Sequence, residues 1–342
     1  MRRPLSFVAL ALLAVAGCKQ QAKVLHVYTW ADYVKPELVA RFEQAEGCMV
    51  VIDTFDSNEA MYAKLKAGAG GYDIITPSSY MVQVMHRQGM LLPLDHAQLP
   101  NLANIDPDVL KIAIDPKMDH SVPYMMTITG IAYLQNKVKD FRPTWAMLDR
   151  TDLAGRMTML ADMRETIGAA LKFLGYGINS TDPKQLEAAR DVVIRWKKNL
   201  AKFENEQYKT GLASGEFLLV HAYSGDILQV QGENADIAFA VPEEGTSIAC
   251  DDLVIPIQSR QAPLAHRFIN FLHDPKVAAE NTEFISYLCP NKASYPLLSE
   301  ETRANPALFV PVEIQAKCEV ITDLGNDNAA YARIWDEIKA AR

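Results

Sequence analysis

The sequence is low in the residues that mark several protein classes. Its 342 residues include 17 Gly, 18 Pro and 5 Cys, which excludes a collagen-like, mucin-like or disulfide-scaffold protein. No apolar run reaches the roughly 20 residues that a membrane-spanning helix needs. Basic residues are outnumbered, 34 against 42 acidic, and the formal charge is -8. We expect no nucleic-acid partner, because proteins that bind a phosphate backbone present basic surfaces.

Catalytic signatures are missing as well. The chain contains no G-x-S-x-G, H-E-x-x-H, P-loop or G-x-G-x-x-G motif. Its seven histidines are scattered, and we expect a structural role for His221, the one nearest a predicted cleft strand. We therefore predict no catalytic residue and no cofactor. A hydrolase acting through paired carboxylates stays open, because such pairs are defined by their separation in space.

Four cysteines beyond residue 18 carry no metal pattern. None has C-x-x-C spacing or a neighbouring histidine, so we predict no metal site. In an oxidising compartment they allow up to two disulfides in three pairings, and free buried thiols are an equal alternative. The four are Cys48, Cys250, Cys289 and Cys318.

The N-terminus resembles a bacterial lipoprotein signal. Arg2 and Arg3 precede the apolar segment Leu5 to Ala16, and small residues stand before Cys18. We expect a signal peptide over 1–17, lipidation of Cys18 and an anchor linker over 18–23. The mature protein would then lie in the periplasm or at the outer leaflet of the cell envelope, on the membrane through its lipid alone. An ordinary secretory signal with an incidental cysteine is the alternative.

The remaining chain is predicted to be α/β. Short apolar runs alternate with amphipathic ones, which is typical of a mainly parallel sheet covered by helices. Asp56 and Glu59 form a predicted capping box, and Pro275 stops or restarts a helix. The predicted strands are 24–30, 49–55, 72–75, 217–223, 237–241 and 252–257, and the predicted helices are 36–46, 58–67, 182–200 and 264–272.

Chain length and the lack of a linker predict two lobes with a cleft. A single core stops growing at about 250–300 residues, so 342 residues favour two lobes. No flexible linker joins them, which indicates that the chain crosses between the lobes more than once and forms a hinge.

Aromatic and acidic residues gather next to the predicted strands. Ligands of open α/β sheets bind at the carboxyl ends of strands. A carboxylate binds an ammonium through charge-assisted hydrogen bonds, and an aromatic face attracts the same cation while covering methylenes. These residues therefore predict a site for a flexible chain with cations at its ends. The segments concerned are 30–33, 78–80, 162–165, 223–226 and Asp251.

Seven stretches then identify a family resemblance. In the same order along the chain, they resemble the periplasmic spermidine/putrescine-binding proteins of bacterial ABC importers, over about residues 24–342. The stretches are HVYTWADYV (26–34), DSNEAMYAKL (56–65), YDIITPSSY (72–80), VPYMMTITGIAY (122–133), ADMRETIGAAL (161–171), LGYGINSTDPKQLEAA (174–189) and YLCPNKASYP (287–296).

The resemblance implies a two-lobed periplasmic-binding-protein fold that holds a polyamine in a cleft between its lobes. The implied lobes are 24–128 plus 250–296, and 129–249 plus 297–342. The protein would be a monomer that performs no chemistry and delivers its ligand to an ABC permease and ATPase complex. The implied ligand-binding residues are Trp30, Asp32, Tyr33, Ser78, Tyr80, Asp162, Glu165, Tyr223, Asp226, Asp251 and Tyr287.

Their implied roles differ. Aromatic walls are supplied by Trp30, Tyr33, Tyr287 and by Tyr223, which stands where the family has a tryptophan. Asp32 would face an ammonium, Asp162 and Glu165 would form the acidic pair of the spermidine binders, Asp226 would match a carboxylate of the putrescine binders, and Asp251 would be the central carboxylate.

Two positions depart from the family, and the ligand stays open. Ala249 stands where relatives have a large aromatic ring, and Ile321 where spermidine binders have an amide. The acidic residues mix features of putrescine and spermidine binders, so the sequence does not choose between putrescine, spermidine and another amine such as cadaverine. A protein of this fold for another cationic solute, and a polyamine sensor, are further alternatives.

Overall fold

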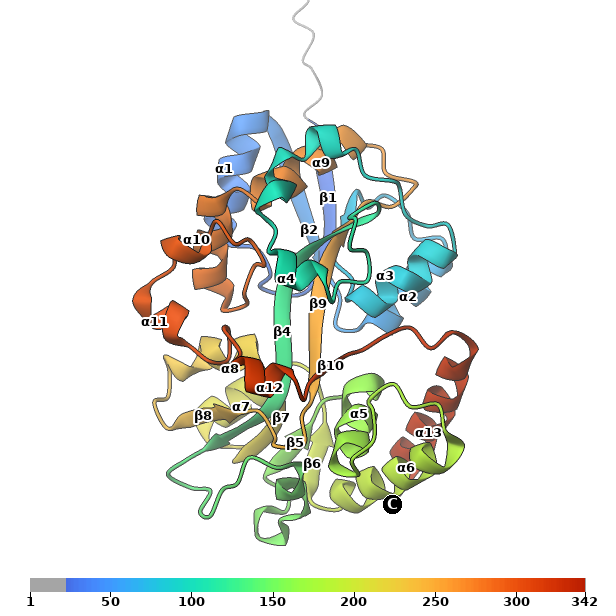
Figure 1. Ribbon diagram of the computed structural model, residues 1–342, viewed down its shortest axis with the longest axis vertical. Coiled ribbons are helices and arrows are strands. Elements are labelled where there is room, and N and C mark those ends of the chain that lie inside the picture. The colour runs from blue at the N-terminus through green and yellow to red at the C-terminus, as the bar shows by residue number, and fades with distance from the viewer. Residues whose placement is uncertain (1–22, 342) are drawn as a thin grey trace, which may run out of the picture.

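The protein has two lobes, one above the other (Figure 1). The computed structural model describes residues 23–341, so the predicted signal peptide, Cys18 and most of the anchor linker lie outside the described residues. The first lobe contains the parallel strands β1 (Lys23–Thr29), β2 (Cys48–Thr54) and β3 (Ile74–Ile75), and the second contains β5 (Met157–Met159), β6 (Leu200–Phe203) and β7 (Leu219–Tyr223). Across residues 23–341, no helix is both long and apolar enough to span a membrane.

Two long strands run through both lobes. β4 (Ser121–Leu134) and β9 (Ser247–Val254) are antiparallel to each other at the centre of the sheet, whose order is β2-β1-β3-β9-β4-β7-β5-β6. The 14 residues of β4 span about 45 Å at roughly 3.3 Å per residue, enough to reach from one lobe into the other. β8 (Ile237–Ala240) pairs with β4, and β10 (Glu319–Val320) with β9. The predicted α/β class and two-lobed architecture are confirmed.

Helices surround the sheet in both lobes. With the first lobe lie α1 (Pro36–Glu46), α2 (Asn58–Lys66), α3 (Ser79–Arg87), α4 (Pro107–Leu110), α9 (Ala262–Leu272) and α10 (Pro275–Ile285). With the second lie α5 (Met163–Phe173), α6 (Pro183–Lys197), α7 (Tyr208–Ser214), α8 (Ser224–Gln231) and α13 (Asn328–Ala340), while α11 (Glu300–Ala304) and α12 (Val312–Gln315) connect the lobes along one side.

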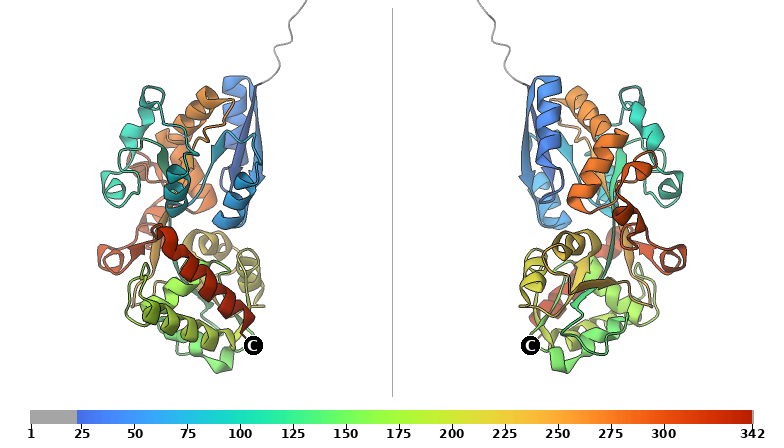
Figure 2. Two further views of the ribbon diagram at one scale, coloured as in Figure 1. Left: turned by 90° about the vertical axis from the view of Figure 1, so that its right-hand side faces the viewer. Right: turned by 90° about the vertical axis from the view of Figure 1, so that its left-hand side faces the viewer.

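Each lobe has its own hydrophobic core. In the first lobe, Leu38 and Phe42 of α1 pack with Phe268 of α9. In the second, Trp196 of α6 packs with Ile334 of α13. Figure 2 shows α13 lying against the second lobe, although it is the last element of the chain. Because each lobe buries apolar side chains of its own, the polar residues at the junction are not needed to form either core.

The structure corrects several local predictions. Ser57, not Asp56, caps α2: it has extended backbone, and its hydroxyl accepts from the N–H of Ala60 at 3.3 Å. Glu59 is no capping partner, because its carboxylate accepts from the Tyr80 hydroxyl at 3.0 Å. The helix predicted to reach residue 200 ends at Lys197, and an unpredicted strand, β6, follows.

Other differences concern β9 and the cysteines. β9 covers 247–254 rather than 252–257, because its pairing with β10 begins at Ser247 and its pairing with β4 at Ile248. Pro275 restarts the chain as α10, with Asp274 as the helix cap. All four cysteines of the described chain are free thiols: Cys48, Cys250, Cys289 and Cys318.

We predict that Ser57→Ala destabilises the protein by about 1 kcal/mol, since a helix N–H loses its capping acceptor. The midpoint of urea unfolding measures the change. Asp56→Ala is the matched control. We expect its free energy of unfolding to lie within about 0.5 kcal/mol of the parent's. A larger loss for Asp56→Ala than for Ser57→Ala would contradict this assignment of the cap.

Candidate functional site

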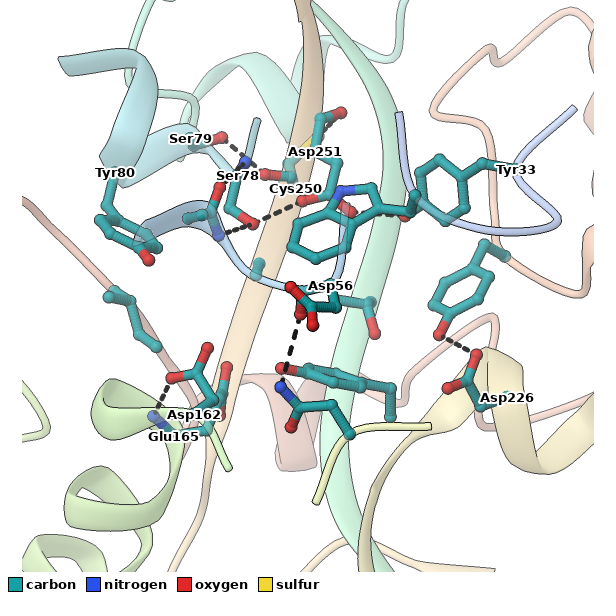
Figure 3. A pocket seen from close by; sticks show the side chains of 18 of the residues that line it. Tyr33, Asp56, Ser78, Ser79, Tyr80, Asp162, Glu165, Asp226, Cys250 and Asp251 are labelled. Atoms are coloured by element: carbon teal, nitrogen blue, oxygen red, sulfur yellow. Dashed lines mark hydrogen bonds between the residues drawn. The ribbon is translucent and has the colours of Figure 1, made fainter. Parts of the chain in front are cut away.

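A cavity of about 110 Å³ lies where the two lobes meet (Figure 3). It has space for several water molecules, since one needs roughly 10–15 Å³. Ten of the eleven predicted ligand-binding residues line it. They are Trp30, Tyr33, Ser78, Tyr80, Asp162, Glu165, Tyr223, Asp226, Asp251 and Tyr287.

Asp251 is the carboxylate at the centre of this cavity. It lies on β9 and is 7% exposed. One carboxylate oxygen accepts from the Ser78 hydroxyl at 2.6 Å and the other from the Tyr33 hydroxyl at 2.5 Å. Burial raises the pKa of Asp251 to about 6, although both hydrogen bonds act to lower it. Neutral hydroxyls thus orient this carboxylate, and no cation among residues 23–341 forms an ion pair with it.

The residues around Asp251 are themselves fixed. Asn58 holds Ser78 from two sides: its amide donates to the Ser78 hydroxyl at 3.0 Å and its oxygen accepts from the Ser78 N–H at 3.0 Å. Asp252, next along β9, points to the opposite side of the strand and accepts from the Ser79 hydroxyl at 2.6 Å. Its pKa is raised to about 7 by burial and by the charge of Asp251.

Asp162 and Glu165 form an acidic pair at one end of the cavity, on the left in Figure 3. Asp162 caps α5 by accepting from the N–H groups of Arg164 at 2.8 Å and Glu165 at 3.0 Å. Glu165 is 6% exposed and accepts from the hydroxyls of Ser247 at 2.6 Å and Thr129 at 3.1 Å. Burial, with the nearby charge of Asp162, raises the pKa of Glu165 to about 8.

Arg164, between these two acids in sequence, forms its hydrogen bonds elsewhere. Its guanidinium donates to the Thr322 carbonyl and to the Asn179 side chain, both at 2.8 Å. It also lies 4.8 Å from the centre of the Tyr331 ring. Arg164 thereby attaches α5 to the chain segment after β10, and it forms no ion pair with the acidic pair.

Asp226 marks the other end of the cavity, on the right in Figure 3. Tyr287 donates to one of its oxygens at 2.8 Å and Tyr208 donates to the other. Residue 225 must be glycine for this contact, because a Cβ there would lie 2.3 Å from the Tyr287 ring. The hydrogen bond from Tyr287 also joins the end of α10 to α8, one element from each lobe.

Aromatic rings form much of the remaining wall. Trp30 packs against Phe55, with ring centres 4.4 Å apart, and Tyr33 lies 5.6 Å from Tyr287. Tyr80 and Tyr223 complete the set. The Thr127 hydroxyl also lies in this wall, and it is buried without a hydrogen-bond partner among the described residues. A ligand with an N–H group could satisfy it.

The structure does not bring Asp32 into the cavity lining. Asp32 has a positive φ of 54°, its side chain is 70% exposed, and it lies 3.9 Å from the Lys209 ammonium. Trp30 and Tyr33, on either side of it, line the cavity, whereas Asp32 lies beside Lys209 and is not part of the lining. Its contact with a ligand ammonium stays a prediction.

Several lining residues were not predicted from the sequence. Asp56 follows the end of β2, so the rule that selects residues at strand ends would have found it. Asn205, Glu206 and Lys209 follow β6, a strand that the sequence pattern did not reveal. Ala249 and Ile321, the two departures from the family, also line the cavity.

The lining is rich in acidic residues and suits a cation. It contains six carboxylates, one ammonium and no histidine. His221 is buried in the second lobe against Trp145, and burial lowers its pKa to about 3. Within residues 23–341, no group of three or more histidine, cysteine or acidic residues could hold a metal ion.

Comparisons with known proteins agree with this geometry. The model of the bacterial extracellular solute-binding protein family matches residues 37–310. The spermidine/putrescine-binding periplasmic protein of Salmonella typhimurium is 34% identical, over 100% of this chain and 99% of its own. The putrescine/cadaverine-binding protein of Pseudomonas aeruginosa is 34% identical, over 99% of each. The solved structure of the TpPotD lipoprotein of Treponema pallidum is 32% identical, with a TM-score of 0.84 over 92% of this chain and 99% of its own.

We predict that the ligand-free protein loses stability as the pH rises from 5 to 8. Glu165 keeps its proton to about pH 8 when folded, whereas an unfolded glutamate loses it near pH 4.3. The folded state therefore binds more protons in this window, and the free energy of unfolding falls by at most about 1.4 kcal/mol per pH unit for each such group.

Urea unfolding of the parent and of Glu165→Gln across this range measures the effect. The variant should lose less stability with rising pH, because its amide does not ionise. Parallel pH profiles for the two proteins would contradict the burial of a protonated Glu165.

Proposed function

The chain belongs to the bacterial extracellular solute-binding proteins, and we propose that it binds a polyamine and delivers it to an ABC importer. One observation carries this proposal: carboxylates and aromatic rings from both lobes converge on one cavity. The names of the relatives from Salmonella and Pseudomonas, which bind spermidine, putrescine or cadaverine, support the same class of ligand.

The electrostatics favour an ammonium ligand. Moving a charge out of water costs several kcal/mol unless it is paired. Asp251 and Glu165 are buried, accept their hydrogen bonds from hydroxyls and form no ion pair with a described residue, and burial raises their pKa values to about 6 and about 8. A ligand ammonium would supply the missing positive charge to each, through charge-assisted hydrogen bonds. Micromolar binding needs about 8 kcal/mol, which two such pairs with aromatic contacts can provide.

The aromatic walls suit the carbon chain between the ammonium groups. Three aromatic rings line the cavity together with Asp251: those of Trp30, Tyr33 and Tyr287. Tyr33 donates to Asp251, and its ring centre lies 5.6 Å from that of Tyr287. Such rings cover methylenes and attract the flanking cations. We propose that the ten lining residues named above form the polyamine site, with Asp226 at the end that a third ammonium would reach, and that the Thr127 hydroxyl is a further contact.

Contacts between the lobes support a hinge that closes on the ligand. Besides the Tyr287 to Asp226 bond, the Gln229 amide donates to the Ile285 carbonyl at 2.8 Å and the Asn205 amide to the Asp56 carbonyl at 3.4 Å. We propose lobes of 24–128 plus 250–296 and 129–249 plus 297–342, which rotate about β4 and β9. Closure excludes water and gives the permease and ATPase complex a shape that differs from the open form.

The proposed setting is outside the cytoplasm. The relatives are periplasmic proteins in Salmonella and a lipoprotein in Treponema. We propose a monomer attached to the membrane through lipid on Cys18, with no nucleic-acid partner and no cofactor. In this role the protein carries its ligand without altering it.

Binding without chemistry has a direct test. Incubated for a day with an excess of putrescine or spermidine, the protein should return each amine unchanged in mass spectrometry. The lining offers no histidine as a general base, and its central carboxylate already accepts two hydrogen bonds. A product that forms with the parent protein and not with heat-denatured protein would show an enzyme instead.

We predict that Asp251→Asn weakens putrescine binding at least about 30-fold, because one ammonium would be buried without its counter-charge. Calorimetry on protein stripped of bound ligand by unfolding and refolding measures the affinity. Glu187→Gln, an exposed position on α6, removes the same charge outside the cavity and should leave the affinity within about twofold. Equal affinities for Asp251→Asn and the parent would overturn the proposed site.

A further inference from the structure

Lys209 is the one basic residue among the described residues that line the cavity. It lies in the first turn of α7, and its ammonium donates to the Gln229 side chain at 3.2 Å. Asp32, on the other lobe, lies 3.9 Å away, too far for a hydrogen bond but close enough for an ion pair. The Lys209 side chain is 22% exposed, so the protein holds this ammonium largely inside the cleft.

The position of Lys209 is at the Asp226 end of the cavity. Tyr208, the preceding residue, donates to the Asp226 carboxylate. Gln229, which accepts from Lys209, follows Asp226 by one turn of α8. Glu206 is close as well. Burial raises the pKa of its carboxyl, the nearby charge of Asp226 raises it further, and the charge of Lys209 lowers it. The Lys209 ammonium thus lies at the Asp226 end, paired with Asp32 and close enough to Glu206 to lower its pKa.

The opposite end has no such ammonium. There, Asp162 and Glu165 accept only from backbone N–H groups and hydroxyls, and Arg164 donates to Thr322 and Asn179. Asp251, between the two ends, is likewise bonded to hydroxyls. The described carboxylates that form no ion pair with the protein therefore extend from the centre of the cleft to the Glu165 end.

We propose that Lys209 determines the specificity of the site: its ammonium occupies the Asp226 end, so the cleft binds an amine with two ammonium groups in preference to one with three. This inference rests on the proposed function. A two-ammonium ligand pairs with Asp251 and with the acidic pair, and its chain ends before Lys209. A third ammonium would enter the Asp226 end, where Lys209 already holds a positive charge.

The physical reason is repulsion between like charges in a partly enclosed site. Two charges a few ångströms apart repel several times more strongly there than in water, because the effective dielectric constant is lower. Lys209 is part of the chain, so its ammonium cannot diffuse away as a bound ion could. A ligand could move it only by breaking its contacts to Gln229 and Asp32. The Lys209 side chain is 22% exposed, so solvent and salt screen part of its charge. We therefore expect Lys209 to change the ratio of the two affinities about tenfold, rather than to abolish spermidine binding.

The test compares putrescine with spermidine, by calorimetry on ligand-stripped protein, for the parent and for Lys209→Met. The parent should bind putrescine more tightly than spermidine. In Lys209→Met the ratio of the two affinities should shift about tenfold toward spermidine. Lys209→Arg keeps the charge and should keep the parent's preference. Lys198→Met, at the exposed end of α6, removes one charge outside the cleft and should leave the ratio unchanged.

Each other result overturns the inference. A parent that prefers spermidine, or an unchanged ratio in Lys209→Met, rejects the role of Lys209 while the proposed polyamine function stands. A lowered melting temperature with equal loss of both affinities in Lys209→Met shows a structural role only. If the parent binds neither amine, the proposed function fails, and the inference fails with it.

Discussion

The arrangement of this protein depends on buried carboxylates that form no ion pair with a cation of the described chain. Asp251 is held by two hydroxyls and Glu165 by two more, and burial raises the pKa of each. Such groups destabilise the ligand-free fold, because a buried acid either keeps its proton or bears an unpaired charge. In the proposed function, a polycation would convert this cost into binding energy, and the acids that destabilise the ligand-free protein would select its ligand.

The sheet explains how these acids meet. β4 and β9 pass through both lobes, and β9 places Asp251 at the junction. The other acids come from helix starts near the ends of neighbouring strands, as with Asp162 at the N-terminus of α5 after β5, and Asp226 in the first turn of α8 after β7. Most apolar side chains of each lobe are buried in that lobe's own core.

Much of the architecture and most of the cavity lining could be predicted from the sequence. α1 was predicted with its observed bounds, since Pro36 and Gly47 mark its two ends. The rule that ligands bind at strand ends, with the family resemblance, selected Asp251 and Glu165 correctly as lining residues. Local patterns of this kind are visible in a sequence because they depend on neighbouring residues.

What the sequence did not predict depends on contacts between distant segments. Asp32 lies beside Lys209, a residue distant in the sequence, and not in the cavity lining, which no local pattern around Asp32 signals. β6 has no alternating pattern, so Lys209, which follows it, was missed. The hydroxyls that orient Glu165 come from Thr129 and Ser247, on two strands separated from it in sequence.

Proton release on binding tests the central claim most directly. Calorimetric titration of the stripped protein with putrescine at pH 7, in buffers of different ionisation enthalpy, counts the protons exchanged. If buried acids lose their protons to pair with ammonium groups, the complex must release protons, and affinity must rise with pH between about 6 and 8. Binding with no proton release, or with proton uptake, would contradict the account.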